Sequence, residues 1–288
     1  MGNSLAGQRV MIVGGNSGMG LAVSARLMKM HCQVLIVGRS RDKLEAAREQ
    51  LRTLGDSAYP PLRAAGNVAI EQAPTLGSAA QAPSRTTGDA ASKQWPAFNA
   101  PILLQADVTD EAQVQQLFEK SGPVDHVICT AADIRGAYEL LPQLPLNALD
   151  RAIRSKVIAP ILLAKHGAPR MPAHGSITLT SGIAAYRPRP KGVAVAAINA
   201  ALEGVVRAMA VELAPLRINA VSPGWVRTPI WHDVAGTDSE SLLAAMAERL
   251  PVGRVGTGDD IADAIVFLLG NGYTTGTVLH VDGGHRLV

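Results

Sequence analysis

The sequence of 288 residues has little of what marks a metal-binding, disulfide-linked or exported protein. It contains two cysteines, Cys32 and Cys129, which lie in apolar, strand-like surroundings and lack the spacing of a metal-binding pair. Both are therefore expected to be buried free thiols in a reducing compartment. The sequence starts without the basic stretch and long apolar core of a signal peptide. No cluster of His, Cys and Asp predicts a metal site.

A strong charge imbalance and long uncharged apolar runs are also missing. The 27 basic and 24 acidic residues give a net charge of +3, and the basic residues are scattered apart from the run 187–191. This pattern predicts no nucleic-acid partner. The most apolar stretch is interrupted by Glu203, Arg207 and Glu212, so we expect no segment that spans a membrane. We predict a soluble, cytoplasmic protein.

Short apolar runs alternate with helical patterns along most of the chain. Hydrophobic residues make up 47% of the sequence, which is ample for a core. Strands are expected near residues 9–13, 34–37, 102–104, 126–129, 176–179, 217–221 and 278–281. Helices are expected near residues 21–30, 41–54, 111–120, 146–168, 193–214, 239–249 and 259–269. This alternation predicts an α/β fold, a doubly wound parallel sheet in a single domain over 1–288.

Residues 55–101 break this alternation. The segment is rich in Ala, Pro, Gly, Ser and Thr, has no sustained periodicity, and holds too few apolar residues for a core of its own. A loop of this length inside a compact domain is either functional or disordered. We predict a largely disordered surface insertion and not a second domain.

A glycine-rich loop follows the first expected strand and precedes the first expected helix. There, Gly14 permits a tight turn, Gly18 lets the backbone approach a pyrophosphate, and Gly20 lets helix and strand pack closely. The phosphates then meet free N–H groups at the positive end of the helix dipole. The predicted dinucleotide-binding residues of this loop are Gly14, Asn16, Ser17, Gly18, Met19 and Gly20.

Two later motifs accompany this loop, Pro223-Gly224-Trp225-Val226-Arg227-Thr228 and Val281-Asp282-Gly283-Gly284. Together with the spacing Gly-x-x-x-Gly-x-Gly, they resemble the short-chain dehydrogenase/reductase family, over the whole chain except the insertion. The resemblance implies a Rossmann fold, a nicotinamide cofactor, a small-molecule substrate and a homodimer or homotetramer. It also implies that Thr228 bonds the nicotinamide carboxamide, and that Pro223, Gly224 and Val226 line the cofactor site.

The end of the second expected strand indicates which cofactor is bound. An NAD enzyme usually offers a carboxylate here for the ribose 2′-hydroxyl, and the sequence has Val37-Gly38-Arg39-Ser40 instead. Arg39 can grip a 2′-phosphate in bidentate fashion, and Ser40 adds a hydroxyl. The alternative is that Arg39 simply begins a solvated helix. We predict NADP(H) as the cofactor.

Other cofactor contacts follow from the resemblance. Asp107 and Val108, after the third strand, match the family pair that brackets the adenine. Residues 130–132 follow the fourth strand, where the family has an Asn-Asn-Ala-Gly motif; here Thr130, Ala131 and Ala132 leave room for the ribose.

The family's catalytic pair is missing. Family members carry a Tyr-x-x-x-Lys motif on the central helix, and the flank 200–204 places Val195 and Asn199 at those two positions. Ser181 matches the family serine that orients the substrate, and Lys156 falls where the family has an Asn. Asn199 is kept as a predicted cofactor contact at the position of the lysine.

Replacement catalytic residues are therefore proposed from position, namely Ser181, Lys156, Tyr186, Asp133 and Arg135. Tyr186 follows Ser181 by five residues, and Asp133 and Arg135 follow the fourth strand at the sheet edge where ligands bind. The last four of these residues also have a purely structural explanation. In that alternative, Tyr186 packs under the substrate loop and Lys156 takes over a ribose contact. Asp133 and Arg135 then form an exposed ion pair of little energetic value.

Loss of the tyrosine constrains the chemistry. Reduction of an unactivated ketone develops alkoxide charge and needs a proton donor, whereas an iminium or conjugated electrophile accepts hydride without it. We therefore predict an NADP(H)-dependent oxidoreductase that reduces an activated C=N, C=C or C=O bond, similar to atypical family members of natural-product pathways. A cyclase, or bifunctional reductase/cyclase, that keeps bound NADP is one alternative, and a non-catalytic NADP-sensing module is another.

The sequence also predicts a substrate lid and a subunit interface. Residues 229–250, which include Trp231 and His232, are predicted to form a mobile substrate lid. The helix 193–214 is apolar on nearly every side, which predicts burial beyond the monomer core and fits a homodimer or homotetramer.

Overall fold

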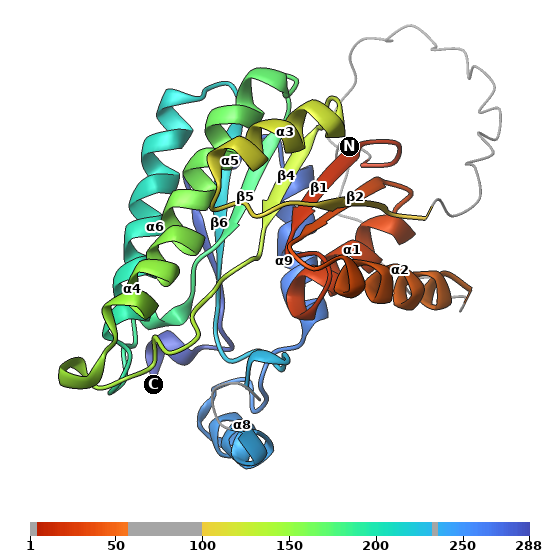
Figure 1. Ribbon diagram of the computed structural model, residues 1–288. Helices are drawn as coiled ribbons and strands as arrows, with labels where there is room; N and C mark the ends of the chain where they lie inside the picture. Colours follow the sequence, from red (N-terminus) through yellow and green to blue (C-terminus); the bar gives the residue numbers. More distant parts are fainter. Residues whose placement is uncertain (1–4, 57–99, 232–235) are drawn as a thin grey trace, which may run out of the picture.

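Seven parallel strands form the centre of the protein, in the order β3-β2-β1-β4-β5-β6-β7 (Figure 1). The computed structural model describes residues 5–56, 100–231 and 236–288. The strands are β1 (Arg9–Val13), β2 (Gln33–Gly38), β3 (Ile102–Gln105), β4 (His126–Cys129), β5 (Ser176–Thr180), β6 (Arg217–Pro223) and β7 (Val278–Val281). The strand order reverses between β1 and β4, so the carboxyl ends of these two strands flank a switch point, the usual ligand site of such sheets.

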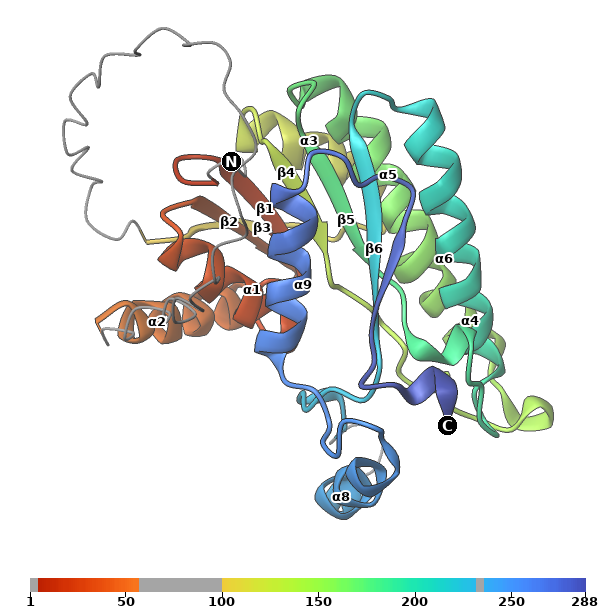
Figure 2. The same ribbon diagram turned by 180° about the vertical axis from the view of Figure 1, so that it is seen from behind.

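Helices cover both faces of the sheet (Figures 1 and 2). The longer helices are α1 (Gly18–Lys29), α2 (Arg41–Asp56), α3 (Glu111–Ser121), α4 (Leu146–Ile153), α5 (Ala159–Gly167), α6 (Val193–Glu212), α8 (Ser239–Arg249) and α9 (Gly258–Gly270). One apolar core joins the sheet to α3, α5 and α6, and a second joins it to α1, α2 and α9. The predicted doubly wound α/β fold is confirmed.

Burial on both faces explains why the strands read as continuous apolar runs. Every residue of β4, β5 and β6 is buried, and parallel strands covered on both sides need no polar face. Some polar side chains in these strands are hydrogen-bonded internally; for example, Asn219 Nδ2 donates to Thr274 O at 2.9 Å. Both cysteines are buried and free, as predicted.

The helix predicted over 146–168 is interrupted. A π-helical turn, Arg154–Ile158, separates α4 from α5. Such turns are rare and are frequently found at functional sites. This one carries Ser155 and Lys156, both buried. The apolar periodicity of the sequence continues through the turn, so it gave no sign of the extra residue.

Two predictions concern residues outside the described ranges. These are residues 57–99 of the insertion predicted over 55–101, and His232 of the predicted lid. Helix α8, in the second half of the predicted lid, lies beyond the carboxyl edge of the sheet (Figures 1 and 2). Among the described helices, α6 is the one whose length and composition would allow it to cross a membrane. Half of its apolar stretch is buried inside the fold, as in the core helix of a globular domain.

Candidate cofactor and catalytic site

The glycine loop is so tight at Gly14 and Gly20 that neither position has room for a side chain. Gly14 has φ of 85°, in the left-handed region that favours glycine. A Cβ atom on Gly20 would lie 2.2 Å from the carbonyl oxygen of Gly14. The first turn of α1 therefore packs directly on the end of β1. Ser17 precedes α1 and its side chain makes no capping hydrogen bond, so the loop presents the start of the helix to an anion.

The end of β4 closes the other side of this loop. Thr130 Oγ1 donates to the carbonyl oxygen of Val13 at 3.2 Å, and a Cβ atom on Gly14 would lie 2.9 Å from the Ala131 nitrogen. The structure thus brings Gly14 and Gly20 next to Thr130 and Ala131 at the switch point. Thr228 borders the same loop, since a Cβ on Gly18 would lie 3.6 Å from the Thr228 side chain.

Arg39 lies at the end of β2 with an exposed side chain, and its Nη1 donates to Asp133 Oδ2 at 3.3 Å. Because β1 lies between β2 and β4 in the sheet, this ion pair spans the carboxyl end of β1. The guanidinium is therefore held beside the glycine loop. Ser40 faces α2, where its Oγ accepts from the Lys43 backbone N–H at 3.4 Å.

Asp133 is buried, whereas both of its arginine partners are exposed. Arg135 donates two hydrogen bonds to its carboxylate, at 2.9 and 2.6 Å. The Asp133 backbone N–H also donates to Ser155 Oγ at 2.9 Å. The hydrogen bonds from Arg135 lower the pKa of Asp133 to about 2. The ion pair between Asp133 and Arg135 is therefore formed, as the structural alternative expected, but its carboxylate is buried and fixed between the loop after β4 and the π-helical turn.

The predicted adenine-side pair lies after β3. Asp107 Oδ1 accepts hydrogen bonds from the Thr109 backbone N–H and Oγ1, at 3.0 and 2.8 Å. Val108 is buried in the core beneath. One carboxylate oxygen of Asp107 is therefore engaged in shaping its own turn.

The two residues predicted at the positions of the family's catalytic pair, Val195 and Asn199, lie on the inner face of α6. Val195 is 5% exposed and belongs to a small apolar cluster with Ala137, Ala152 and Ile198. No acid can act from that position. Asn199 is also buried, and its Oδ1 has no hydrogen-bond partner. A buried amide oxygen without a partner indicates that something else satisfies it when the site is filled.

Lys156 reaches the end of β5 from the π-helical turn. Its Nζ donates to the carbonyl oxygen of Thr180, and to that of Ser181 at 3.1 Å. Burial lowers the pKa of Lys156 to about 8. The ammonium group is thus anchored on the backbone that presents Ser181.

Glu203 was missed as a site residue in the sequence. It is 6% exposed, and Ser181 Oγ donates to its Oε1 at 2.9 Å. Tyr186 OH donates to its Oε2 at 2.5 Å. Burial, and then the hydrogen bond to Glu203, raise the pKa of Tyr186 to about 12. The available signal was spacing, since 195, 199 and 203 follow one another at intervals of four on one helix face.

The segment after β6 is fixed by aromatic contacts. Trp225 and Trp231 stack with ring centroids 4.3 Å apart, and Trp231 Nε1 donates to the Val226 carbonyl at 2.7 Å. A Cβ on Gly224 would lie 2.7 Å from the Asp282 backbone. The two predicted motifs, 223–228 and 281–284, therefore pack on each other next to the glycine loop.

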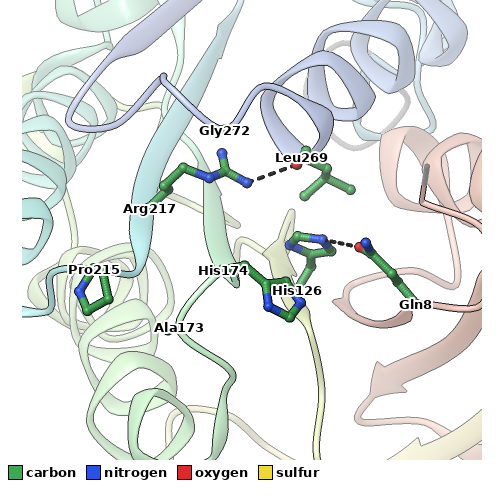
Figure 3. A pocket seen from close by; sticks show the side chains of 8 residues that line it. All are labelled: Gln8, His126, Ala173, His174, Pro215, Arg217, Leu269 and Gly272. Atoms are coloured by element: carbon green, nitrogen blue, oxygen red, sulfur yellow. Dashed lines mark hydrogen bonds between the residues drawn. The ribbon is translucent and has the colours of Figure 1, made fainter. Parts of the chain in front are cut away.

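A separate cavity of about 240 Å³ lies at the opposite edge of the sheet (Figure 3). Gln8, His126 and Arg217, which line it, come from the starts of β1, β4 and β6. His126 is held between Ser176 Oγ at 2.8 Å and Gln8 Oε1 at 2.7 Å, and burial lowers its pKa to about 4. The Arg217 guanidinium is engaged by the carbonyls of Leu268 and Leu269. These groups are satisfied internally and face away from the glycine loop.

The parallel sheet, its switch point and the glycine loop after β1 together define a Rossmann-type fold. Two family models match the chain: "Enoyl-(Acyl carrier protein) reductase" over residues 64–286, and "short chain dehydrogenase" over residues 8–72. The chain belongs to the short-chain dehydrogenase/reductase family.

Relatives of similar length are found among fungal proteins. The short-chain dehydrogenase/reductase malC of Malbranchea aurantiaca is 29% identical, over 98% of this chain and 96% of the relative. The short-chain dehydrogenase/reductase ATR9 of Stachybotrys chlorohalonatus is 28% identical, over 98% of both.

Two solved structures extend the likeness. The MalC reductase/Diels-Alderase of Malbranchea aurantiaca superimposes with a TM-score of 0.78 at 27% identity, and covers 99% of each chain. A small-chain dehydrogenase in complex with NADPH superimposes with a TM-score of 0.71 at 29% identity, over 98% of this chain and all of the other.

Proposed function

We propose that the protein is an NADP(H)-dependent reductase of an activated C=N, C=C or C=O bond in a small metabolite. The observation that carries the proposal is the position of Arg39 beside a loop that excludes side chains at Gly14 and Gly20. A 2′-phosphate needs a cation at this point, and a nicotinamide dinucleotide needs the close backbone approach. The structural relative solved with NADPH supports this choice.

The residues present fit that cofactor. The glycine loop and the start of α1 would hold the pyrophosphate, Arg39 the 2′-phosphate, and the unpaired Oδ1 of Asn199 a ribose hydroxyl. Thr228 borders the loop and would hold the carboxamide. When bound, NADPH supplies the hydride.

The chain's own residues then orient the substrate and exclude water. Lys156 fixes the backbone of Ser181, so the serine hydroxyl is held at the end of β5. Val195 belongs to an apolar cluster, so the position of the family tyrosine offers no proton to the substrate. This arrangement suits an electrophile that is activated before it binds, since positioning supplies much of the catalysis. The lid proposed over 229–250 would close over such a substrate.

A cyclase, or a bifunctional reductase/cyclase, is the second candidate. It is favoured by the similarity to a reductase/Diels-Alderase over nearly the whole of both chains, and by the apolar cluster around Val195. The test is an assay with NADPH and with NADP⁺ on enone, imine and ketone probes. Consumption of NADPH supports reduction, product formed without net redox change supports the cyclase, and binding without product supports an NADP sensor.

We also propose a cytoplasmic homodimer or homotetramer. Helix α6 exposes Val193 and Val211, and the neighbouring α5 exposes Ile161, although all three are large apolar side chains. Light scattering on the purified full chain tests this. A monomer at micromolar concentration would refute it.

A further inference from the structure

Three side chains form an unbroken row of hydrogen bonds behind the candidate site. Ser181, at the end of β5, donates to one oxygen of Glu203 on α6, at 2.9 Å. Tyr186 donates to the other oxygen, at 2.5 Å. A hydroxyl, a carboxylate and a second hydroxyl thus follow one another, and Glu203 accepts one hydrogen bond on each of its oxygens.

The row leads from the interior to the solvent. Ser181 is 4% exposed and Glu203 6%, whereas Tyr186 is 43% exposed. The Tyr186 ring is held edge-on against His280 on β7, with centroids 4.6 Å apart. The buried end therefore lies at the candidate reaction site and the other end meets water.

The environment of Glu203 is unusual for a structural carboxylate. Buried carboxylates are normally paired with a cation, because desolvation of an isolated charge is costly. Within the described part of the chain, Glu203 forms no ion pair, and the side chains that donate to it are the two hydroxyls. A buried acid that holds the candidate serine on one oxygen and a solvent-facing tyrosine on the other is placed to move protons.

We propose that Ser181, Glu203 and Tyr186 form a proton wire that delivers the proton of the reduction. The proposal rests on the proposed reductase function and deepens it, because it defines the substrate as a neutral activated double bond. As hydride adds to carbon, the Ser181 hydroxyl gives its proton to the other atom of that bond. Glu203, whose carboxylate accepts from both hydroxyls, takes the proton of Tyr186 and passes it on to Ser181, and water reprotonates Tyr186, so all three groups return to their starting forms. One hydride and one proton are added, and NADPH becomes NADP⁺.

This wire replaces a group that the chain no longer has. Val195 cannot donate a proton from the position of the missing tyrosine. A cationic substrate such as an iminium needs hydride alone, so it would have no use for the wire. The charged groups around the wire that will shape its pH dependence are Arg207 on α6, His280 on β7, and Asp282 and Arg286 after β7.

The test compares two probes that differ in charge. 3,4-Dihydroisoquinoline is a neutral imine, and N-methyl-3,4-dihydroisoquinolinium carries a permanent positive charge. With the full chain and NADPH, Glu203→Gln should lower kcat for the neutral probe about 100-fold, the usual scale of a lost proton transfer. The same variant should leave kcat for the methylated probe unchanged. Glu212→Gln, an exposed carboxylate at the end of α6, is the matched control.

Two other variants address the ends of the row. Ser181→Ala removes both the first group of the wire and the hydroxyl that orients the substrate, so it should lower kcat for both probes, and for the neutral probe by a larger factor. It leaves α6 unaltered, so it serves if Glu203→Gln folds poorly. Tyr186→Phe should slow the neutral probe less, since only the solvent end is cut. Tyr273→Phe, at a fully exposed tyrosine, is its control.

The outcomes separate the wire from the reductase function. Equal rates, or equal losses, for the two probes in Glu203→Gln would overturn the wire and leave the reductase function standing. Turnover of the methylated probe alone by the unmodified chain would also overturn the wire. Turnover of neither probe by the unmodified chain would overturn the wire as defined for a neutral imine. Failure of the enone and ketone probes as well would overturn the function.

A measurement without substrate tests the hydrogen bonds. The chain has four tyrosines, and tyrosinate absorbance follows each as it ionises. The pKa of Tyr186 is raised to about 12, by burial and by Glu203. Glu203→Gln should lower it, and Tyr186→Phe should remove the same titration step. A titration that is identical in Glu203→Gln and in the unmodified chain would overturn the Glu203–Tyr186 link.

Discussion

Replacement of Arg39 by alanine removes the cation that faces the expected 2′-phosphate. The side chain is more than half exposed and makes one hydrogen bond, to Asp133. A hydrogen bond to a charged group is worth about 1.5–3 kcal/mol, and solvent exposure places this one near the lower end. Arg39→Ala should therefore weaken NADPH binding about tenfold, since about 1.4 kcal/mol corresponds to one factor of ten. NADH has no 2′-phosphate, so its affinity should hardly change.

Fluorescence titration with both cofactors measures this difference. Arg41→Ala is the matched control, because Arg41 is exposed two residues further on and pairs with Glu45 within α2. Asp133→Asn adds a second comparison, since it frees Arg39 without removing it and should keep the preference for NADPH. Equal weakening of NADPH and NADH in Arg39→Ala would refute the reasoning, as would full retention of both affinities.

Other predictions concern the loop, the anchored lysine, the missing pair and acid stability. Gly20→Ala should lower the free energy of unfolding by about 1–3 kcal/mol in urea titrations, because its Cβ would lie 2.2 Å from the Gly14 oxygen; an unchanged midpoint would contradict the packing. Lys156→Ala should reduce turnover of activated probes, since it releases the carbonyls of Thr180 and Ser181; unchanged kinetics would make the lysine purely structural. Val195→Tyr with Asn199→Lys should introduce reduction of ordinary ketones, and a soluble double variant without any gain would count against the register of α6. The lowered pKa of Asp133 contributes stability above the usual aspartate pKa of about 4, and this is lost as the pH falls toward about 2; Asp133→Asn should therefore destabilise the protein at pH 7 more than at pH 3, and equal effects at both pH values would contradict it.

The fold was predictable because its determinants are local. The apolar runs that form β1, β2 and β4 are buried on both faces, and burial alone requires that pattern. The glycine loop was predictable for the same reason, since a turn that no Cβ can enter leaves its mark directly in the residue type.

The contacts of the site were not predictable, because they join residues far apart in the chain. Arg39 meets Asp133 across 94 positions, and no local pattern encodes that pairing. Glu203 stands out in the sequence as a charge in an apolar helix, a feature that also occurs on solvated faces. Its role depends on the packing of α6 against the segment after β5. The π-helical turn that contains Lys156 leaves no sign in the sequence, because the apolar residues keep the spacing of an α-helix throughout.

The central claim is hydride transfer from NADPH to an activated substrate. Its most direct test is incubation of the full chain with 4-deuterated NADPH, both faces prepared separately, and enone, imine and ketone probes. Mass spectrometry then counts deuterium in each product. Hydride transfer from NADPH should place one deuterium in the product, delivered from one face of the cofactor. A rearranged product without deuterium, or bound cofactor and no product from any probe, would contradict it.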